Sequence, residues 1–178
     1  AIFDRSLNRL RELSARYGGR IKCVFSTQDR IEQAALEADL IIGAVLIPGA
    51  TAPKLISTQT LKKMQNGSVI VDVSIDQGGC FETSKPTTHQ EPTYIVEGVV
   101  HYCVANMPGA VPRTSTYGLN NATLPYITAL ADKGLIQALS DDKGFAEGLN
   151  VHRGEVTHEA VASALDYPYR PVFEALGQ

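Results

Sequence analysis

Hydrophobic and polar positions alternate in blocks from Ala1 to about Val104. Five mostly apolar runs predict β-strands, at residues 1–3, 21–25, 39–46, 68–75 and 99–104. Segments with apolar residues at helical spacing lie between them and predict helices, at residues 6–17, 29–38 and 57–67. The runs at 39–46 and 68–75 are almost continuously apolar, which is typical of parallel strands covered by helices on both faces. The pattern therefore predicts a doubly wound α/β sheet.

The ends of two predicted helices carry local signals. In the segment 6–17, leucines and Tyr17 fall on one helical face, and Gly18-Gly19 is expected to end the helix. The segment 57–67 is expected to form a short capped helix that ends at Asn66-Gly67. A loop rich in proline and threonine is expected at residues 83–93.

The character of the chain changes near Pro112. A long helix is expected after this proline, through residues 127–139, and a hairpin is expected within residues 148–161. Two prolines and a glycine punctuate the chain between Pro108 and Arg113. We therefore expect the sheet domain to end here, with residues 1–112 in one domain and residues 113–178 forming a connecting helix and part of a second domain.

The composition of the chain argues against several classes of function. With 44% hydrophobic and 20% charged residues, the 178-residue chain is expected to be globular, and its formal net charge of −3 argues against binding to nucleic acid or to a membrane surface. Cys23, Cys80 and Cys103 lack CxxC spacing, which argues against disulfides and zinc. The apolar runs are too short to span a bilayer, and no signal peptide is recognised. We therefore expect a soluble, cytoplasmic protein.

The first residues lack an expected element. A nucleotide-binding α/β sheet usually opens with a strand and a Gly-rich turn, and its second strand ends in an acid. Here Asp4 follows the first apolar run at once, and no Gly-rich loop precedes it. We expect the chain to begin at the second strand of such a sheet, as a fragment of a longer protein. Asp4 then suits an adenosine ribose, although capping of the next helix is an alternative.

The most unusual segment is residues 71–86. Asp76 and Gly78-Gly79 follow a predicted buried strand, and doubly wound folds place their sites at such strand ends. Asp76 is a candidate base or substrate ligand, with a turn built from Asp and Gly as the alternative. Asp72 lies inside the strand and is expected to cap a loop or to pair with a buried donor.

A second candidate lies at the end of the strand 99–104. The amide of Asn106 can bind a carboxamide or a ribose. His101 and Cys103 fall on one strand face, and we expect them in the core or on the surface rather than at a metal. We predict no metal site. The motifs GxSxG, GxxxxGK[ST] and HExxH are absent, which argues against the corresponding hydrolases, nucleotide triphosphatases and zinc proteases.

Together, residues 4–10, 38–56, 67–89 and 102–126 resemble the alanine dehydrogenase family. The strings IDQGGCFE and CVANMPGAVPRTST are long, and their composition is unusual. The related nicotinamide nucleotide transhydrogenases resemble the chain less, because they lack the Asp76-Gln77 pair. The resemblance implies the cofactor NAD and a Rossmann-type sheet without its first strand and Gly-rich loop. It makes residues 1–112 a partial NAD-binding domain and residues 113–178 a connecting helix and the C-terminal part of the substrate domain.

The resemblance also implies roles for individual residues. Asp76 matches the catalytic aspartate of the family. The positions that match cofactor-binding residues are Asp4, Arg9, Ser26, Val45, Leu46, Val73, Ser74, Ile75, Asp76, Lys85, Val104, Ala105, Asn106 and Met107. Lys85 stands where arginine is common, so its contact with the cofactor is an open question.

The implied reaction is the reversible oxidative deamination of L-alanine to pyruvate and ammonia. The family takes a histidine and substrate-binding Arg and Lys residues from a preceding half that has no counterpart here. The resemblance thus implies an inactive fragment of a homo-oligomeric enzyme. A transhydrogenase-type NAD(H)-binding subunit and a non-catalytic nucleotide-binding module are the alternatives.

Overall fold

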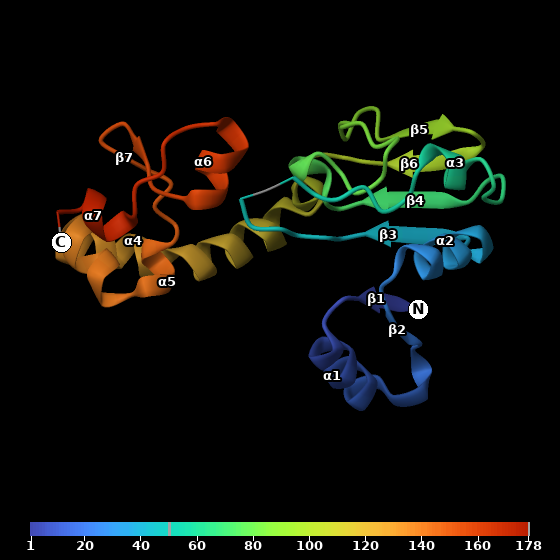
Figure 1. The fold of residues 1–178 in the computed structure, drawn as a ribbon, viewed down its shortest axis with the longest axis horizontal. Helices are drawn as coiled ribbons and strands as arrows, with labels where there is room; N and C mark the ends of the chain where they lie inside the picture. Colours follow the sequence, from blue (N-terminus) through green and yellow to red (C-terminus); the bar gives the residue numbers. More distant parts are fainter. Residues whose placement is uncertain (50, 178) are drawn as a thin grey trace. The chain divides into compact units, whose positions relative to one another are not determined.

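A computed structural model describes residues 1–49 and 51–177 (Figure 1). The chain divides into two compact units. The first comprises Ala1–Val45 and Ala52–Ala105, and the second comprises Leu46–Thr51 and Asn106–Gln178. The division into functional domains at residue 112 stays a prediction.

The first unit contains two separate sheets, whereas the sequence pattern predicted one. In the smaller sheet, β1 (Ile2–Asp4) pairs in parallel with β2 (Cys23–Phe25). The larger sheet has the order β3-β4-β6-β5 (Figure 1). Its parallel strands are β3 (Leu40–Gly43), β4 (Val69–Asp72) and β6 (Val99–Tyr102). The predicted parallel α/β fold is confirmed for these strands.

The edge strand β5 (Thr93–Val96) was not predicted from the sequence. It pairs antiparallel with β6 through the turn Glu97-Gly98, whose φ angles are 49° and 78°. Two successive positive φ angles are typical of a two-residue hairpin turn, because this geometry follows the twist of paired strands. The glycine after a short apolar run was the available signal. The loop assigned to residues 83–93 therefore gives way to a strand at Thr93.

Side-chain caps begin the helices of the first unit. Ser6 caps α1 (Leu7–Tyr17), which ends at Gly18 as predicted, with φ 59°. Thr27 caps α2 (Gln28–Glu37). The predicted helix at residues 57–67 is wrong in length, since α3 (Thr58–Leu61) is one turn long. The next residues form turns, in which the Lys63 and Met64 N–H groups bind carbonyls only three residues back.

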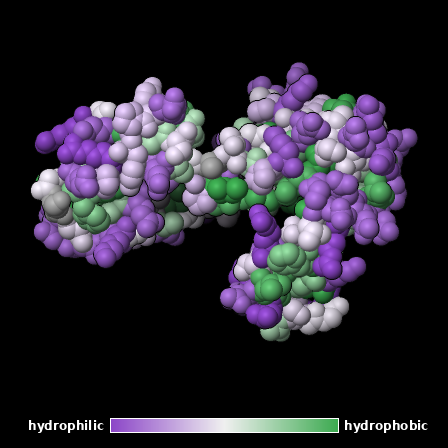
Figure 2. Space-filling view, viewed as in Figure 1, coloured by the Kyte–Doolittle hydropathy of each residue, from purple (hydrophilic) through white to green (hydrophobic). Residues whose placement is uncertain are grey.

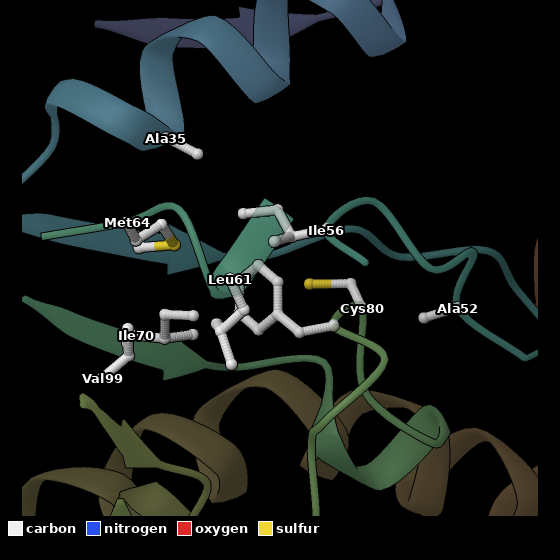
Figure 3. Packing of buried hydrophobic residues seen from close by; sticks show 9 residues of the cluster. Ala35, Ala52, Ile56, Leu61, Met64, Ile70, Cys80 and Val99 are labelled. Atoms are coloured by element: carbon white, nitrogen blue, oxygen red, sulfur yellow. The ribbon is translucent and has the colours of Figure 1, made fainter. Parts of the chain in front are cut away.

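The core of the first unit lies on one face of the larger sheet. Its buried residues come from strands, from α2 and α3, and from loops (Figure 3): Ala35, Ala52, Ile56, Leu61, Met64, Ile70, Cys80, Phe81 and Val99. The expected cover on both faces is wrong for β3, because Leu40 and Ile42 are 55% and 62% exposed. Apolar surface also reaches the solvent on the side of the molecule drawn in Figure 2.

Gly43 marks a close approach beneath the end of β3. A Cβ atom at this position would meet the buried Cys80 Sγ and would lie 2.6 Å from Cζ of Phe81. We expect Gly43→Ala to lower the free energy of unfolding by about 1–3 kcal/mol, because overpacking displaces core side chains. Urea denaturation of the full-length protein measures this change. In the control Gly19→Ala, the new Cβ meets nothing within 4 Å. Equal stability of the two variants would contradict the tight packing.

The second unit is built around the long helix α4 (Pro112–Asp141), which begins after the loop turn η3 (Met107–Ala110). This confirms the helix expected after Pro112, although Gly134 breaks its helical geometry with φ 73° and ψ 168°. The predicted hairpin is also confirmed. The remaining elements are α5 (Lys143–Ala146), β7 (Val151–His152), β8 (Glu155–Val156), α6 (Glu159–Leu165) and α7 (Val172–Ala175). Within the described residues, no helix is both long and apolar enough to cross a membrane.

Candidate functional site

The carboxyl ends of β3, β4 and β6 lie next to one another in the first unit. The Val73 N–H donates to the Gly43 carbonyl at 2.8 Å, and the Ser74 hydroxyl donates to the Val45 carbonyl at 2.7 Å. On the other side of β4, β6 pairs in register and leads into the buried Val104 and the exposed Ala105. Residues predicted from three separate segments therefore meet along one edge of the sheet.

Asp76 lies in a single 3-10 turn, η2 (Ile75–Gln77), directly after β4. Its side chain is exposed, whereas Ser74 and Ile75 are buried beneath it. Gly78 and Gly79 follow with φ angles of 85° and 74°, which L side chains adopt at a cost. The turn expected as the alternative is therefore present, and it presents the Asp76 carboxylate to solvent.

Hydrogen bonds to the buried Asp72 carboxylate hold this turn in place. Its fully buried carboxylate accepts the Ser74 N–H at 3.0 Å, the Cys80 N–H at 2.9 Å and the Ser84 hydroxyl at 2.5 Å. Each of these donors lies in the loop that carries Asp76. The expectation that Asp72 pairs with buried donors is confirmed.

Cys80 is the thiol nearest to Asp76 in sequence. It is fully buried, and its Sγ lies 3.6 Å from Oδ1 of Asp72. Burial and the neighbouring carboxylate raise the pKa of the Cys80 thiol to about 12. Because the thiolate is the nucleophilic form, Cys80 serves packing rather than covalent chemistry.

His101 is a core residue, which is one of the two alternatives that the sequence left open. Its ring stacks on Tyr94 with centroids 4.9 Å apart, and its Nδ1 lies 2.9 Å from the Val99 carbonyl oxygen. A carbonyl can only accept, so Nδ1 carries the proton and Nε2 accepts from the Thr83 hydroxyl at 2.7 Å. Burial lowers the pKa of His101, which favours this neutral ring. Both ring nitrogens are thus engaged in structural hydrogen bonds.

Lys85 is exposed near the same network. Its backbone N–H donates to the Tyr94 hydroxyl at 2.7 Å, and that hydroxyl donates to the Thr83 carbonyl at 2.9 Å. Burial raises the pKa of Tyr94, so its hydroxyl keeps its proton. The backbone of Lys85 is therefore fixed. A contact between its side chain and a cofactor stays a prediction.

Asp4 and Ser26 lie together at the ends of β1 and β2. The Ser26 N–H donates to the Asp4 carbonyl at 2.9 Å, and Oδ1 of Asp4 accepts the Ser6 N–H at 2.7 Å. Capping of the helix by Asp4 is wrong, because Ser6 is the cap of α1. Arg9 is exposed on α1 and pairs with Glu12 at 3.0 Å.

Leu46, Asn106 and Met107 belong to the second unit. Leu46 is 73% exposed, and Asn106 adopts a left-handed conformation with φ 59° before η3. Their participation in one site with the strand ends of the first unit stays a prediction.

Lys54 was missed by the sequence analysis. Its ammonium donates to the carbonyls of Gly78 and Gly79, at 2.5 and 2.8 Å, in the loop that carries Asp76. More than twenty residues separate the lysine from these glycines, with separations of 24 and 25. Lys54 follows a proline in a loop, and its neighbours in the sequence do not indicate such a contact.

Known proteins match nearly the whole chain. Residues 1–159 match the family model described as "Alanine dehydrogenase/PNT, C-terminal domain". An alanine dehydrogenase of Halomonas elongata is 63% identical over 176 residues, which are 99% of this chain and 47% of the relative. One from Mycolicibacterium smegmatis is 53% identical over 168 residues, covering 94% of this chain and 45% of the relative.

Solved structures agree with these matches. A structure named L-alanine dehydrogenase has a TM-score of 0.79 and 51% identity, and the match covers 93% of this chain and 45% of that one. A transhydrogenase from Sinorhizobium meliloti has a TM-score of 0.56 and 22% identity, covering 89% of this chain and 42% of that one, which shows a shared fold alone. This chain spans about half the length of the curated relatives it matches. With most of its residues inside the family model, and with the resemblance of its motifs confirmed, the chain belongs to the alanine dehydrogenase/PNT C-terminal domain family.

Proposed function

We propose that the chain is the cofactor-binding half of an NAD-dependent L-alanine dehydrogenase. L-alanine, NAD⁺ and water give pyruvate, ammonium, NADH and a proton, and the reaction is reversible. The observation that carries the proposal is the exposed Asp76 on the rigid turn η2, beside the adjoining ends of β3 and β4. Doubly wound folds bind their ligands at such strand ends.

The residues at the two sheet ends fit a dinucleotide. Asp4 is half-buried at the end of a parallel strand and can accept hydroxyl hydrogen bonds from a ribose. Ser26 lies beside it, directly after β2. Val45, Val73 and Ser74 surround the end of β4, where backbone and small side chains can line a nicotinamide ribose. NAD⁺ would supply the hydride acceptor, which no amino-acid side chain provides.

Asp76 would act on the substrate. Its carboxylate can hold the amino group of L-alanine by an ion pair and can orient or deprotonate the water that replaces ammonia. The neighbouring residues Ser74 and Ile75 are buried, which fixes the backbone of the turn that carries the carboxylate. Such fixed placement is a large part of what an active site contributes.

The rest of the activity is assigned to a longer protein. Substrate-binding Arg and Lys residues, a histidine acid or base and the Gly-rich phosphate loop would come from residues outside this chain. We further propose that the full-length enzyme is a cytoplasmic homo-oligomer. The Asp76-Gln77 pair favours this function over a transhydrogenase-type subunit, in accord with the higher identity to alanine dehydrogenases.

Asp4 provides a test of the cofactor. A 2′-phosphate would meet the Asp4 carboxylate, and close like charges cost several kcal/mol. We expect the full-length enzyme to favour NAD over NADP in kcat/KM by at least about tenfold, since each tenfold corresponds to 1.4 kcal/mol. Asp4→Asn keeps an oxygen for the Ser6 N–H and should reduce this preference.

The matched control for this test is Asp29→Asn, which removes an exposed carboxylate from the first turn of α2. It should leave the NAD preference unchanged. Equal use of NAD and NADP by the unaltered enzyme would remove Asp4 from the ribose site.

A further inference from the structure

Lys54 lies on a segment that runs alongside the loop carrying Asp76. The Ala52 N–H donates to the Gln77 carbonyl at 3.0 Å, and the Leu55 N–H donates to the Cys80 carbonyl at 2.7 Å. These two bonds place Lys54 opposite the glycine pair. These backbone hydrogen bonds fix the position of Lys54, and its side chain reaches the two glycine carbonyls from there.

The Lys54 ammonium binds the loop from its exposed side. It donates to the Gly78 and Gly79 carbonyls at 2.5 and 2.8 Å while the residue remains exposed. A hydrogen bond from a charged donor is stronger than a neutral one. Both acceptors belong to glycines with positive φ angles, 85° and 74°, whose backbones have the most freedom to lose.

Asp72 holds the same loop from the inside. Its buried carboxylate accepts N–H groups at both ends of the glycine turn, from Ser74 and Cys80. A Cβ atom at Gly79 would lie 2.7 Å from Oδ2 of Asp72, so the backbone passes directly over the carboxylate. The buried Asp72 carboxylate thus binds N–H groups of the loop, and the exposed Lys54 ammonium binds its carbonyl groups. Together these contacts favour a single conformation of the loop.

We propose that Lys54 is a positioning residue for Asp76, acting with the inner anchor Asp72 to fix the turn at residues 73–80. This inference rests on the proposed function, because it assigns Lys54 a role in placing the catalytic carboxylate. Lys54 touches the loop carbonyls and acts through them. Without the ammonium, the glycine turn gains freedom and Asp76 spends less time in its productive position, and a misplacement of about 1 Å can cost about 100-fold in rate.

Lys54→Met in the full-length enzyme tests this role, since methionine keeps much of the length and loses the charge. We expect kcat to fall about 10- to 100-fold per folded molecule. The melting temperature should fall by no more than about 3 °C, because an exposed charged contact contributes about 1 kcal/mol or less. Amide hydrogen exchange at Gly78, Gly79 and Cys80 should become about tenfold faster, which reports on the loop without using turnover.

Two further variants sharpen the test. Lys54→Arg retains a cation that can reach carbonyls and should recover most of the lost kcat. Lys63→Met is the matched control, because it removes another exposed lysine of the same unit, one that follows α3 and does not belong to the segment beside the loop. It should leave kcat and amide exchange unchanged.

The outcomes separate this inference from the proposed function. If Lys54→Met matches Lys63→Met in both kcat and exchange, Lys54 does not position the loop. Faster exchange with unchanged kcat, or a lower activity explained wholly by unfolding, would also overturn the positioning role. If Asp76→Asn retains turnover, the proposed role of Asp76 fails, while the exchange data still show whether Lys54 holds the turn.

Discussion

Replacing Asp76 with asparagine in the full-length enzyme is expected to slow oxidative deamination about 10²- to 10⁴-fold, or roughly 3 to 5 kcal/mol of activation free energy. Asparagine is nearly isosteric, so the exposed turn η2 should keep its backbone. The variant loses the negative charge and the ability to take a proton. Steady-state formation of NADH with L-alanine measures the effect, and calorimetric NAD binding shows that the cofactor site is intact.

Two other aspartates calibrate the Asp76 result. Asp39→Asn removes an exposed carboxylate just before β3, at the opposite end of the strand from the site, and should leave turnover unchanged. Asp72→Asn places an amide donor among the buried N–H and hydroxyl donors that now bind Asp72. We expect this variant to lose about 1–3 kcal/mol of stability. Near-normal turnover of Asp76→Asn with an unchanged melting temperature would show that the wrong aspartate was assigned.

A protein made of residues 1–178 alone is expected to show no turnover. The sequence contains no GxGxxG loop to hold a pyrophosphate, and the proposal assigns the substrate-binding groups to the other half of the enzyme. The relatives are about twice as long as the part that this chain matches. NADH absorbance with L-alanine and NAD should stay at the blank level for this chain.

Supplying the missing half provides the control for that result. Co-expression with the remainder of the full-length protein should restore alanine-dependent NADH formation, because the strand ends and Asp76 are already formed in this chain. Turnover by residues 1–178 alone, with no other half present, would contradict the assignment of the substrate groups.

Local sequence patterns predicted most of the first unit. Helical spacing and caps predicted α1, and apolar runs predicted the parallel strands β3, β4 and β6. The strand β5 was missed because its apolar run is only three residues long and directly follows a loop rich in proline and threonine. The helix at residues 57–67 was drawn too long, since its polar end is also suited to turns.

The candidate site was only partly predictable. Asp76 stands out in the sequence because an acid and two glycines follow a buried strand, and Asp72 stands out as an acid within that strand. Lys54 does not stand out, because its contact depends on a pairing between segments that are distant in sequence. The pattern of residue types along the sequence indicates turns and the periodicity of helices and strands. Long-range backbone pairing, which places Lys54 over the glycine carbonyls, appears only when the chain is folded.

We propose that this chain carries the cofactor half of an alanine dehydrogenase. The most direct test is to incubate the purified full-length protein with L-alanine and NAD and to measure NADH, pyruvate and ammonia together. The proposal predicts equal amounts of the three products, dependent on L-alanine. NAD binding without alanine-dependent NADH formation would contradict it, and hydride exchange between NADH and NADP in the same protein would favour the transhydrogenase-type alternative.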